Sequence, residues 1–346
     1  RDELISLPLQ QRGLITMVLR KLLASSTRAI AGGLTTLRDR LANLDQVDRD
    51  PADEFADEAF DEDWLDDLSE TSLVQDEATA HWSLAEEIAA IDQLLAIANG
   101  IDVDRRAVSL VDALRSGFAE MQKLGAPEKA VIFTESRRTQ NWLRAFLERN
   151  GFKDRIVCFN GSNSDPEARA ILDAWEKRHP DAKATGSRAA NVRAALVDHF
   201  REQGTLLIAT EAGAEGLNLQ FSSLVVNYDL PWNPQRIEQR IGRCHRYGQR
   251  FDVVVINFLD ELNRADERVL ELLTDKCQLF DGVFGASDEV LGAIESGVGL
   301  EVRINRIFRT CRSPEAIEAA FAELRSEMDE VIQQREASAR RALLDH

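Results

Sequence analysis

The sequence predicts an α/β fold in which a parallel-sheet lobe is flanked by N- and C-terminal helical regions. Three observations predict it. Short apolar, strand-like segments recur between residues 105 and 260, amphipathic helical patterns separate most of them, and the patterns on either side of this region are helical. Strands that alternate with helices are typical of a parallel sheet covered on both faces.

The elements divide the chain into three regions. Residues 1–104 are expected to be helical, with an apolar stripe over residues 14–23 and a second one, over residues 84–95, that ends before Gly100. Residues 105–260 form the sheet lobe, with a polar loop expected at 177–187. Residues 261–346 form a helical extension, in which Ser313 caps and Pro314 opens a last amphipathic helix. The expected strands are 130–134, 155–159, 206–210, 224–228 and 252–258.

Composition narrows the class of protein. The chain has 346 residues, of which 44% are hydrophobic, and no apolar run approaches the eighteen residues that cross a membrane. The N-terminus does not resemble a signal peptide, so we expect a cytoplasmic protein without a membrane partner. Its four cysteines form no C-x-x-C pair, which favours reduced thiols and no metal site.

The negative charge is concentrated in one segment. Fifteen carboxylates and one arginine lie between Asp45 and Glu77, a local charge of −14, so the rest of the chain carries only about −4 of the total −18. Such a run is usually a solvated or disordered insertion in a helical region. A segment that mimics DNA or docks on a partner is the alternative. A nucleic-acid partner for the sheet lobe is therefore not excluded.

Two arginines stand three residues apart near the end of a predicted helix. Arg243 and Arg246 belong to the segment Q-R-I-G-R-C-H-R-Y-G-Q at 239–249 and should share one face of that helix. Two guanidiniums side by side, with Gln239 one turn earlier, suit a polyanionic ligand such as a nucleoside triphosphate. Surface ion pairs with Glu238 or Asp229 are the alternative explanation.

This segment resembles the last conserved motif of the superfamily 2 helicase-like ATPases, and its closing Gly248-Gln249 favours their Swi/Snf-type branch. Three further segments agree. L-L-I-A-T-E-A-G-A-E-G-L-N at 206–218 is similar to the fifth motif of the family, N-Y-D-L-P-W-N-P-Q at 227–235 to its aspartate-to-Trp-Asn-Pro element, and V-I-F-T-E-S at 131–136 to the motif that begins the second motor lobe. Residues 277–292 are similar to the segment after the motor in bacterial RNA-polymerase-recycling ATPases of the HepA/RapA type. The resemblance implies a RecA-like C-terminal lobe.

One part of such a motor is missing from the sequence. No G-x-x-x-x-G-K-[ST] occurs, so the loop that holds the β- and γ-phosphates is absent. Two Asp-Glu-Ala strings, at 57–59 and 76–78, mimic the acidic box for magnesium, but neither follows a buried strand. We therefore expect ATP and Mg²⁺ to be bound mainly by an N-terminal RecA-like lobe of a longer parent protein, and the isolated chain to be inactive.

The resemblance also implies roles for individual residues. Arg243 and Arg246 would be arginine fingers that stabilise the γ-phosphate in the transition state, a contribution of roughly 10³ to 10⁵ in rate. ATP contacts would come from Gln239, Gly213, Gly216 and Asn218. Contacts to nucleic-acid phosphates would come from residues at the ends of strands, for each of which a capping or turn role is the alternative: Thr134, Ser136, Asn160, Gly161 and Thr210.

Two classes of function are consistent with these residues. The first is the C-terminal motor lobe of a DNA translocase that acts on double-stranded DNA. The second is a non-catalytic RecA-like module that docks on a partner such as RNA polymerase or a defence complex. A phosphate loop and an acidic box upstream of this chain would decide for the motor.

Overall fold

A computed structural model describes residues 19, 22–23, 25–43, 83–101, 104–181, 187–214, 216–231, 234–245 and 249–259, and then 303, 307, 315–316, 318–324 and 326. The chain divides into two compact units. The first comprises Arg1–Asp229 and Arg240–Phe258, and the second comprises Leu230–Gln239 and Leu259–His346. The sheet lies in the first unit.

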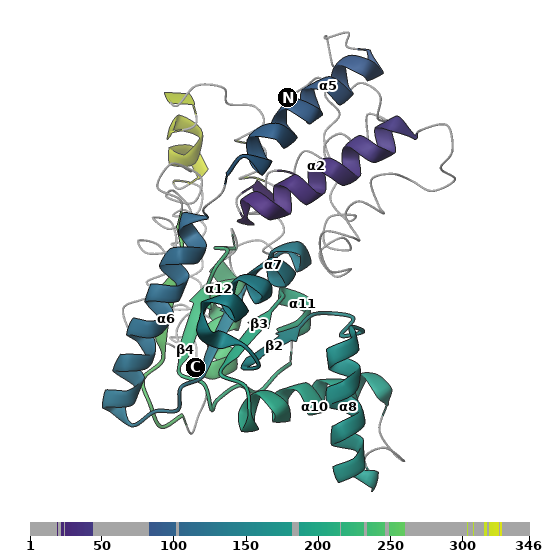
Figure 1. Ribbon diagram of the computed structural model, residues 1–346. Coiled ribbons are helices and arrows are strands. Elements are labelled where there is room, and N and C mark those ends of the chain that lie inside the picture. The colour runs from purple at the N-terminus through teal and green to yellow at the C-terminus, as the bar shows by residue number, and fades with distance from the viewer. Residues whose placement is uncertain are drawn as a thin grey trace, which may run out of the picture. The chain divides into compact units, whose positions relative to one another are not determined.

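The sheet has five parallel strands in the order β2-β3-β1-β4-β5 (Figure 1). Its central strand β1 pairs with β3 on one side and β4 on the other, with Val131 level with Leu207 and Val225. All five expected strands are confirmed, each somewhat shorter than the apolar pattern: β1 Ala130–Phe133, β2 Ile156–Phe159, β3 Leu206–Ala209, β4 Leu224–Asn227 and β5 Val254–Asn257.

Helices cover both faces of the sheet. Side chains alternate along each strand, so Val131 and Phe133 join the apolar cluster of α8 (Pro166–Arg178) and α10 (Arg188–Glu202). Ala130 and Ile132 join the opposite cluster, with α6 (Arg105–Leu124) and α7 (Arg137–Leu147). Burial on both faces explains why the strands read as continuous apolar runs. The predicted α/β class, with a parallel sheet covered by helices, is confirmed.

The described part of the N-terminal region consists of two helices packed on each other. In α2 (Thr27–Ala42) Ser26 is the N-cap, and α5 (Leu84–Asn99) begins with a capping box of Ser83 and Glu86. The second helix ends before Gly100, as its sequence predicts. Its expected apolar stripe is only partly buried, because Ile91 is buried while Leu84 is exposed.

Two expectations need correction, and several others fall outside the described residues. Lys177 and Arg178, placed in a loop by the sequence pattern, form the last turn of α8, where their charge is favourable beside the carbonyl end of the helix. The arginine helix, α12, spans Pro234–Cys244 and so ends before Arg246. Outside the described residues lie Arg246, the acidic tract, residues 182–186 and residues 277–292.

In the second unit, residues 318–324 are helical, and Phe321 and Leu324 are buried, as the pattern of the last expected helix predicts. Its predicted cap, Ser313, and Pro314 are not among the described residues. A search of the described residues found no helix with the length and apolarity that a membrane span requires.

Candidate functional site

Three predicted nucleic-acid contacts lie side by side at the carboxyl edge of the sheet. Asn160, Thr210 and Thr134 directly follow β2, β3 and β1, which are neighbours in the sheet. Main-chain bonds continue the ladders here, because Thr134 N–H donates to Ala209 O at 3.1 Å and Thr210 N–H donates to Phe159 O at 2.9 Å. All three side chains are buried. Parallel strands place these residues at one edge, where open α/β sheets bind ligands.

The hydroxyl groups of Thr134 and Ser136 already have partners within the lobe. Thr134 Oγ1 donates to Asp229 Oδ2 at 2.5 Å, and the N–H of Glu135 donates to the same oxygen at 2.9 Å. Ser136 Oγ caps α7 by accepting from the N–H groups of Arg138 and Thr139. Ser136 Oγ thus has the capping role that the sequence offered as the alternative, whereas Thr134 Oγ1 bonds to the Asp229 carboxylate.

A buried glutamine that sequence analysis missed holds the ends of β2 and β3 together. Gln140 Nε2 donates to Phe159 O at 3.0 Å and to Ile208 O at 2.8 Å, and its Oε1 accepts from Asn160 Nδ2 at 3.1 Å. One signal was available, because Gln140 stands on the apolar stripe of α7, three positions before the buried Leu143. A polar residue in such a stripe needs buried partners.

The turn after β2 is closed by two asparagines. Asn160 N–H donates to Asn163 Oδ1 at 2.9 Å, and Asn163 N–H donates to Asn160 Oδ1 at 2.8 Å. Asn163 has a left-handed backbone, with φ of 43°, which asparagine tolerates. Gly161, inside this turn, is exposed. Of the five predicted nucleic-acid contacts, Gly161 is the one that the described structure exposes.

The connection from β3 to β4 separates the predicted ATP contacts. Gly213 is buried at the carboxyl edge, where an added Cβ would lie 2.7 Å from both Asn160 Cα and Phe159 O, so only glycine fits without a shift. Gly216 is exposed, with φ of 73°. Asn218 lies farther along, at the amino edge, because a chain that joins two parallel strands must return across the sheet.

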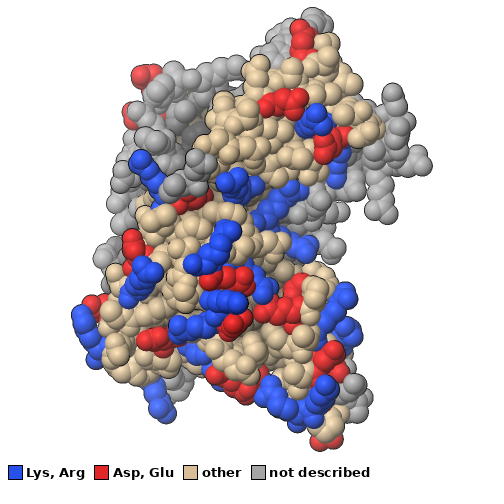
Figure 2. All heavy atoms as spheres, viewed as in Figure 1, with Lys and Arg blue, Asp and Glu red and all other residues tan. Residues whose placement is uncertain are grey.

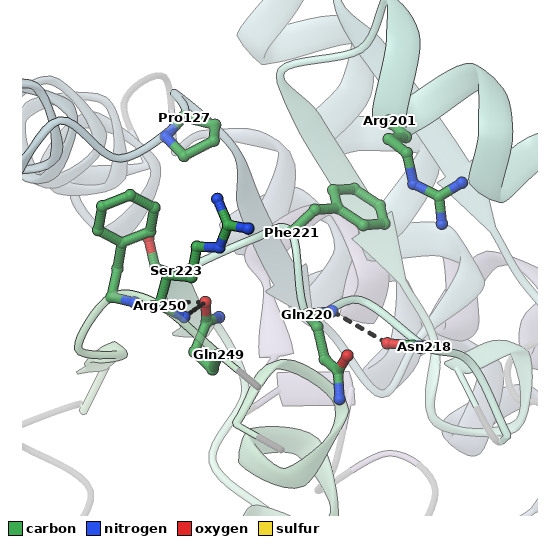
Figure 3. Close-up of a pocket in the computed structure, with 9 residues that line it drawn as sticks. Pro127, Arg201, Asn218, Gln220, Phe221, Ser223, Gln249 and Arg250 are labelled. Carbon is green, nitrogen blue, oxygen red and sulfur yellow. Dashed lines mark hydrogen bonds between the residues drawn. The ribbon is translucent and has the colours of Figure 1, made fainter. Parts of the chain in front are cut away.

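Figure 3 shows the surroundings of Asn218. Its Oδ1 accepts from the N–H of Gln220 at 3.2 Å, and both residues line a pocket of about 400 Å³ that also includes Phe221 and Arg250. The guanidinium of Arg201 lies over the Phe221 ring, 4.8 Å from its centroid. The structure therefore does not bring Asn218 together with Thr134, Asn160 and Thr210.

Arg240 is the most buried charged side chain of the arginine helix, and sequence analysis did not single it out. It is 1% exposed. Its Nε donates to Glu211 Oε2 at 2.8 Å, and Nη1 donates to Asn227 Oδ1 at 3.0 Å and to Asp229 O at 2.9 Å. Its position four residues before the buried Cys244 was the available signal, since residues at this spacing share a helix face.

The end of α12 is bonded to the segment that precedes β4. Leu219 N–H donates to Arg243 O at 3.0 Å, and Gln249 Nε2 donates to both Ser222 O and Cys244 O, at 3.2 and 3.1 Å. Gln249 is the last residue of the motif that favoured the Swi/Snf branch. Its two hydrogen bonds give it a structural role, because they join the end of α12 to the segment before β4. On the helix itself Gln239 is exposed and Arg243 is half-buried.

Burial governs the titration of the described thiols and of one amine. It raises the pKa of Cys158 and of Cys244 to about 12 from an ordinary value near 9. Burial, followed by the charge of Arg155, lowers the pKa of Lys129, whose Nζ donates to Phe200 O at 2.7 Å. Neither described thiol is therefore suited to act as a thiolate near neutral pH.

Basic and acidic side chains lie intermixed over the described residues on the face shown in Figure 2. Several are paired with each other, as in Arg178 with Glu202 at 3.0 Å and Arg201 with Asp198 at 2.9 Å. This view therefore shows no large patch of one sign on these residues. Binding of a polyanion by such a surface would depend on a few positioned groups more than on a general field.

Comparison with known proteins gives a family model that matches part of the chain. Residues 109–248 match the helicase conserved C-terminal domain. The uncharacterized ATP-dependent helicase YqhH of Bacillus subtilis is 38% identical over 197 residues, which is 57% of this chain and 29% of the helicase. RNA polymerase-associated protein RapA of Vibrio cholerae is 34% identical over 106 residues, which is 29% of this chain and 11% of RapA.

The chain thus spans less than a third of the length of either relative. Among solved structures, the C-terminal part of the Fun30 ATPase domain is similar at a TM-score of 0.36 and 19% identity, over 61% of each chain, which is too low to bear on function. Residues 109–248, with the motifs at the strand ends and on α12, thus match a helicase conserved C-terminal domain, and the chain is similar over this part to helicase-like relatives.

Proposed function

We propose that the chain is the C-terminal motor lobe of an ATP-dependent, Swi/Snf-type translocase that moves along double-stranded DNA. The family domain at residues 109–248, the greater length of the relatives and the absence of a phosphate-binding loop from the sequence support this. In the parent protein, this lobe closes on a first RecA-like lobe with each ATP and opens after hydrolysis.

The arginine helix carries the proposal. Arg240 is held inside the lobe, whereas Gln239 is exposed and Arg243, one turn later, is half-buried. The helix thus has an inward arginine that fixes it and an outward face that can meet a ligand. We infer that Arg243 and Arg246 are arginine fingers, which stabilise the charge that develops on the γ-phosphate during its transfer.

ATP and Mg²⁺ would be held mainly by the first lobe. The phosphate oxygens would accept hydrogen bonds from neutral or positively charged groups of this chain. Gln239 and Arg243 carry such groups. Gly216 and Asn218 belong to the segment whose Leu219 is bonded to Arg243 O, which supports a role for both near the arginines. Gly213, by contrast, packs against Asn160 and helps to shape the carboxyl edge.

The carboxyl edge is the proposed nucleic-acid surface. The buried Thr134, Ser136, Asn160 and Thr210 fix its shape through the hydrogen bonds described above, and the exposed Gly161 can approach a phosphate. Contacts of this kind meet the DNA backbone and not the base edges, so they carry no sequence information. A translocase needs such contacts, because it must hold every sequence that it passes.

The test is made in the parent protein with Arg243→Ala and Arg246→Ala. Each should lower ATP turnover by roughly 10³-fold, as expected for a lost transition-state charge, with little change in melting temperature or DNA affinity. Arg178→Ala is the matched control, because Arg178 is about half exposed in a surface ion pair, and it should turn over ATP at the parental rate.

Turnover at the parental rate in either arginine variant would remove that residue from the proposal. The isolated chain supplies a second test, since it lacks the phosphate-binding loop. It should show no ATP hydrolysis above background with or without DNA. DNA-stimulated turnover near one per second by the isolated chain, within the usual range of enzymes, would overturn the assignment as half of an ATPase site.

RNA polymerase is a proposed partner of the parent protein, because relatives of this chain are named RNA polymerase-associated protein RapA. A cytoplasmic location follows from that proposal. Pull-down of RNA polymerase by the parent protein and not by a parent that lacks this chain would support it, and equal recovery by both would contradict it.

A further inference from the structure

An ion pair between a buried arginine and a partly exposed glutamate joins the proposed nucleic-acid edge to the arginine helix. Glu211 is the first residue of α11 (Glu211–Ala214) and follows directly after Thr210 at the end of β3. Arg240 lies on α12, three residues before Arg243. Its Nε donates to Glu211 Oε2 at 2.8 Å, and its Nη2 lies 2.6 Å from the same oxygen. The pair therefore spans the two segments to which the proposed function gives different ligands.

The residues around Arg240 hold its guanidinium in one position. Nη1 donates to Asn227 Oδ1, on the last residue of β4, and to Asp229 O, two residues later, and the group lies over the Phe133 ring at 5.1 Å from the centroid. A planar guanidinium with fixed donors can satisfy three acceptors at once, which a lysine ammonium on a flexible stem does not do in this geometry. A shift of Glu211 would therefore change the position of the helix that carries Arg243.

We propose that the Arg240–Glu211 pair is the positioning contact through which DNA bound at the carboxyl edge sets the orientation of the arginine helix. This inference rests on the proposed function. In that function Arg240 contacts neither ATP nor DNA. A displacement of α11 by bound nucleic acid is passed to α12 through the pair, while the bond from Leu219 to Arg243 O fixes the other end of the helix. Coupling of this kind needs a contiguous packed contact between the two sites, and this pair provides one.

The test measures the ratio of ATP turnover with saturating duplex DNA to turnover without DNA, in the parent protein. Arg240→Lys and Glu211→Gln should each lower this ratio at least about tenfold, which is the coupling lost when one partner no longer acts. The double variant should lose no more than the worse single variant, because the two residues act as one unit. Arg178→Lys with Glu202→Gln, an exposed ion pair, is the matched control and should keep the parental ratio.

Two further measurements separate positioning from other roles. The DNA dissociation constant should stay within about threefold of the parental value, because neither residue binds DNA in the proposal. Equal loss of turnover with and without DNA, in step with a lower melting temperature, would show a purely structural role and overturn the inference. So would a weaker DNA affinity that alone accounts for the lower turnover, or additive losses in the double variant.

If Arg240→Lys fails to fold, Glu211→Gln decides the question, because the Glu211 side chain is 29% exposed and its replacement keeps the shape. An unchanged ratio in that variant would overturn the inference. A parental protein that hydrolyses no ATP, or is not stimulated by DNA, would overturn the proposed function and this inference with it. If DNA stimulates the parent protein and the Glu211→Gln variant keeps the parental ratio, the inference alone is overturned.

Discussion

Ser25 Oγ donates a 2.7 Å hydrogen bond to Asp229 Oδ2, and so joins the start of the N-terminal helical region to the carboxyl edge of the sheet. The same Asp229 oxygen accepts from Thr134 Oγ1, and Ser25 Oγ also lies 2.6 Å from Thr139 Oγ1. All of these side chains are buried. The helical region is thus bonded directly to the edge at which we place the nucleic acid.

Ser25→Ala should lower the free energy of unfolding by about 1–3 kcal/mol, because it removes one donor from a buried carboxylate. Urea unfolding of the chain, followed by circular dichroism, measures this. Ser164→Ala is the control, since Ser164 is exposed and bonds only to Ser162 Oγ at 3.3 Å among the described contacts, and it should change stability by less than about 0.5 kcal/mol. Equal stability of the two variants would contradict the importance of the Ser25 bond.

Two glycine substitutions should have opposite effects. In Gly213→Ala the new Cβ would lie 2.7 Å from main-chain atoms of Phe159 and Asn160, so we expect a loss of about 1–3 kcal/mol from overpacking. In Gly242→Ala the Cβ meets no atom of the described residues within 4 Å, and the greater helix propensity of alanine should stabilise α12 by up to about 1 kcal/mol. Thermal unfolding of both variants checks the signs, and a destabilised Gly242→Ala with an unaffected Gly213→Ala would refute the packing at these positions.

The buried thiols should make stability fall at high pH. The pKa of Cys158 and of Cys244 is raised by burial in the folded chain, to about 12, above the ordinary value near 9 that applies after unfolding. Their contribution to stability is therefore full below about pH 9 and is lost as the pH rises toward 12. Urea unfolding between pH 8 and 10.5 should show a smaller loss in Cys158→Ala than in the wild type, and equal losses would contradict the shift.

Alkylation gives an independent measure of the same thiols. At pH 9 a thiol with a pKa near 12 is ionised about 500-fold less than one with the ordinary pKa near 9. Iodoacetamide should therefore modify both residues far more slowly in the folded chain than in urea. Peptide mass spectrometry resolves the two sites. Rapid modification of Cys158 or Cys244 in the folded chain would show that the site opens.

Removal of the acidic tract should strengthen binding to duplex DNA. Replacement of residues 48–77 by a neutral Gly/Ser segment of equal length removes most of the local charge of −14. The repulsion between these carboxylates and the DNA phosphates is then lost. Fluorescence anisotropy at two salt concentrations on two unrelated duplexes measures the change, which should shrink at high salt.

A chain in which the order of residues 48–77 is scrambled separates the two explanations of the tract. It keeps the charge, so it should bind DNA as the wild type does if the tract acts by repulsion alone. Tighter binding by the scrambled chain, equal to that of the neutral replacement, would instead support a specific docking role. No change in either variant would contradict any effect of the tract on DNA.

The sheet could be predicted from the sequence because both of its faces are covered. Strands such as Val131–Phe133 are then apolar at every position, and this pattern is distinct from that of a helix with one polar face. The motifs likewise placed Thr134, Asn160 and Thr210 at one edge, since each follows a parallel strand. Strand order, however, depends on which helices cross which face, and no local pattern records it.

The site was harder to predict where its residues depend on distant partners. Arg240 looks like one more exposed arginine of a basic helix, because its partner Glu211 is 29 positions away. The place of Asn218 at the amino edge could have been predicted, since the connection between β3 and β4 has to recross the sheet. Whether Arg246 shares a face with Arg243 stays a prediction.

The reciprocal bonds between Asn160 and Asn163 close the turn at the carboxyl edge before any ligand binds. The turn that exposes Gly161 is already closed, so a passing phosphate need not order it, and little conformational entropy is lost at each encounter. A preformed turn therefore needs no slow adjustment when a ligand arrives. Under the proposed function, it would meet each successive phosphate of a DNA backbone with the same geometry.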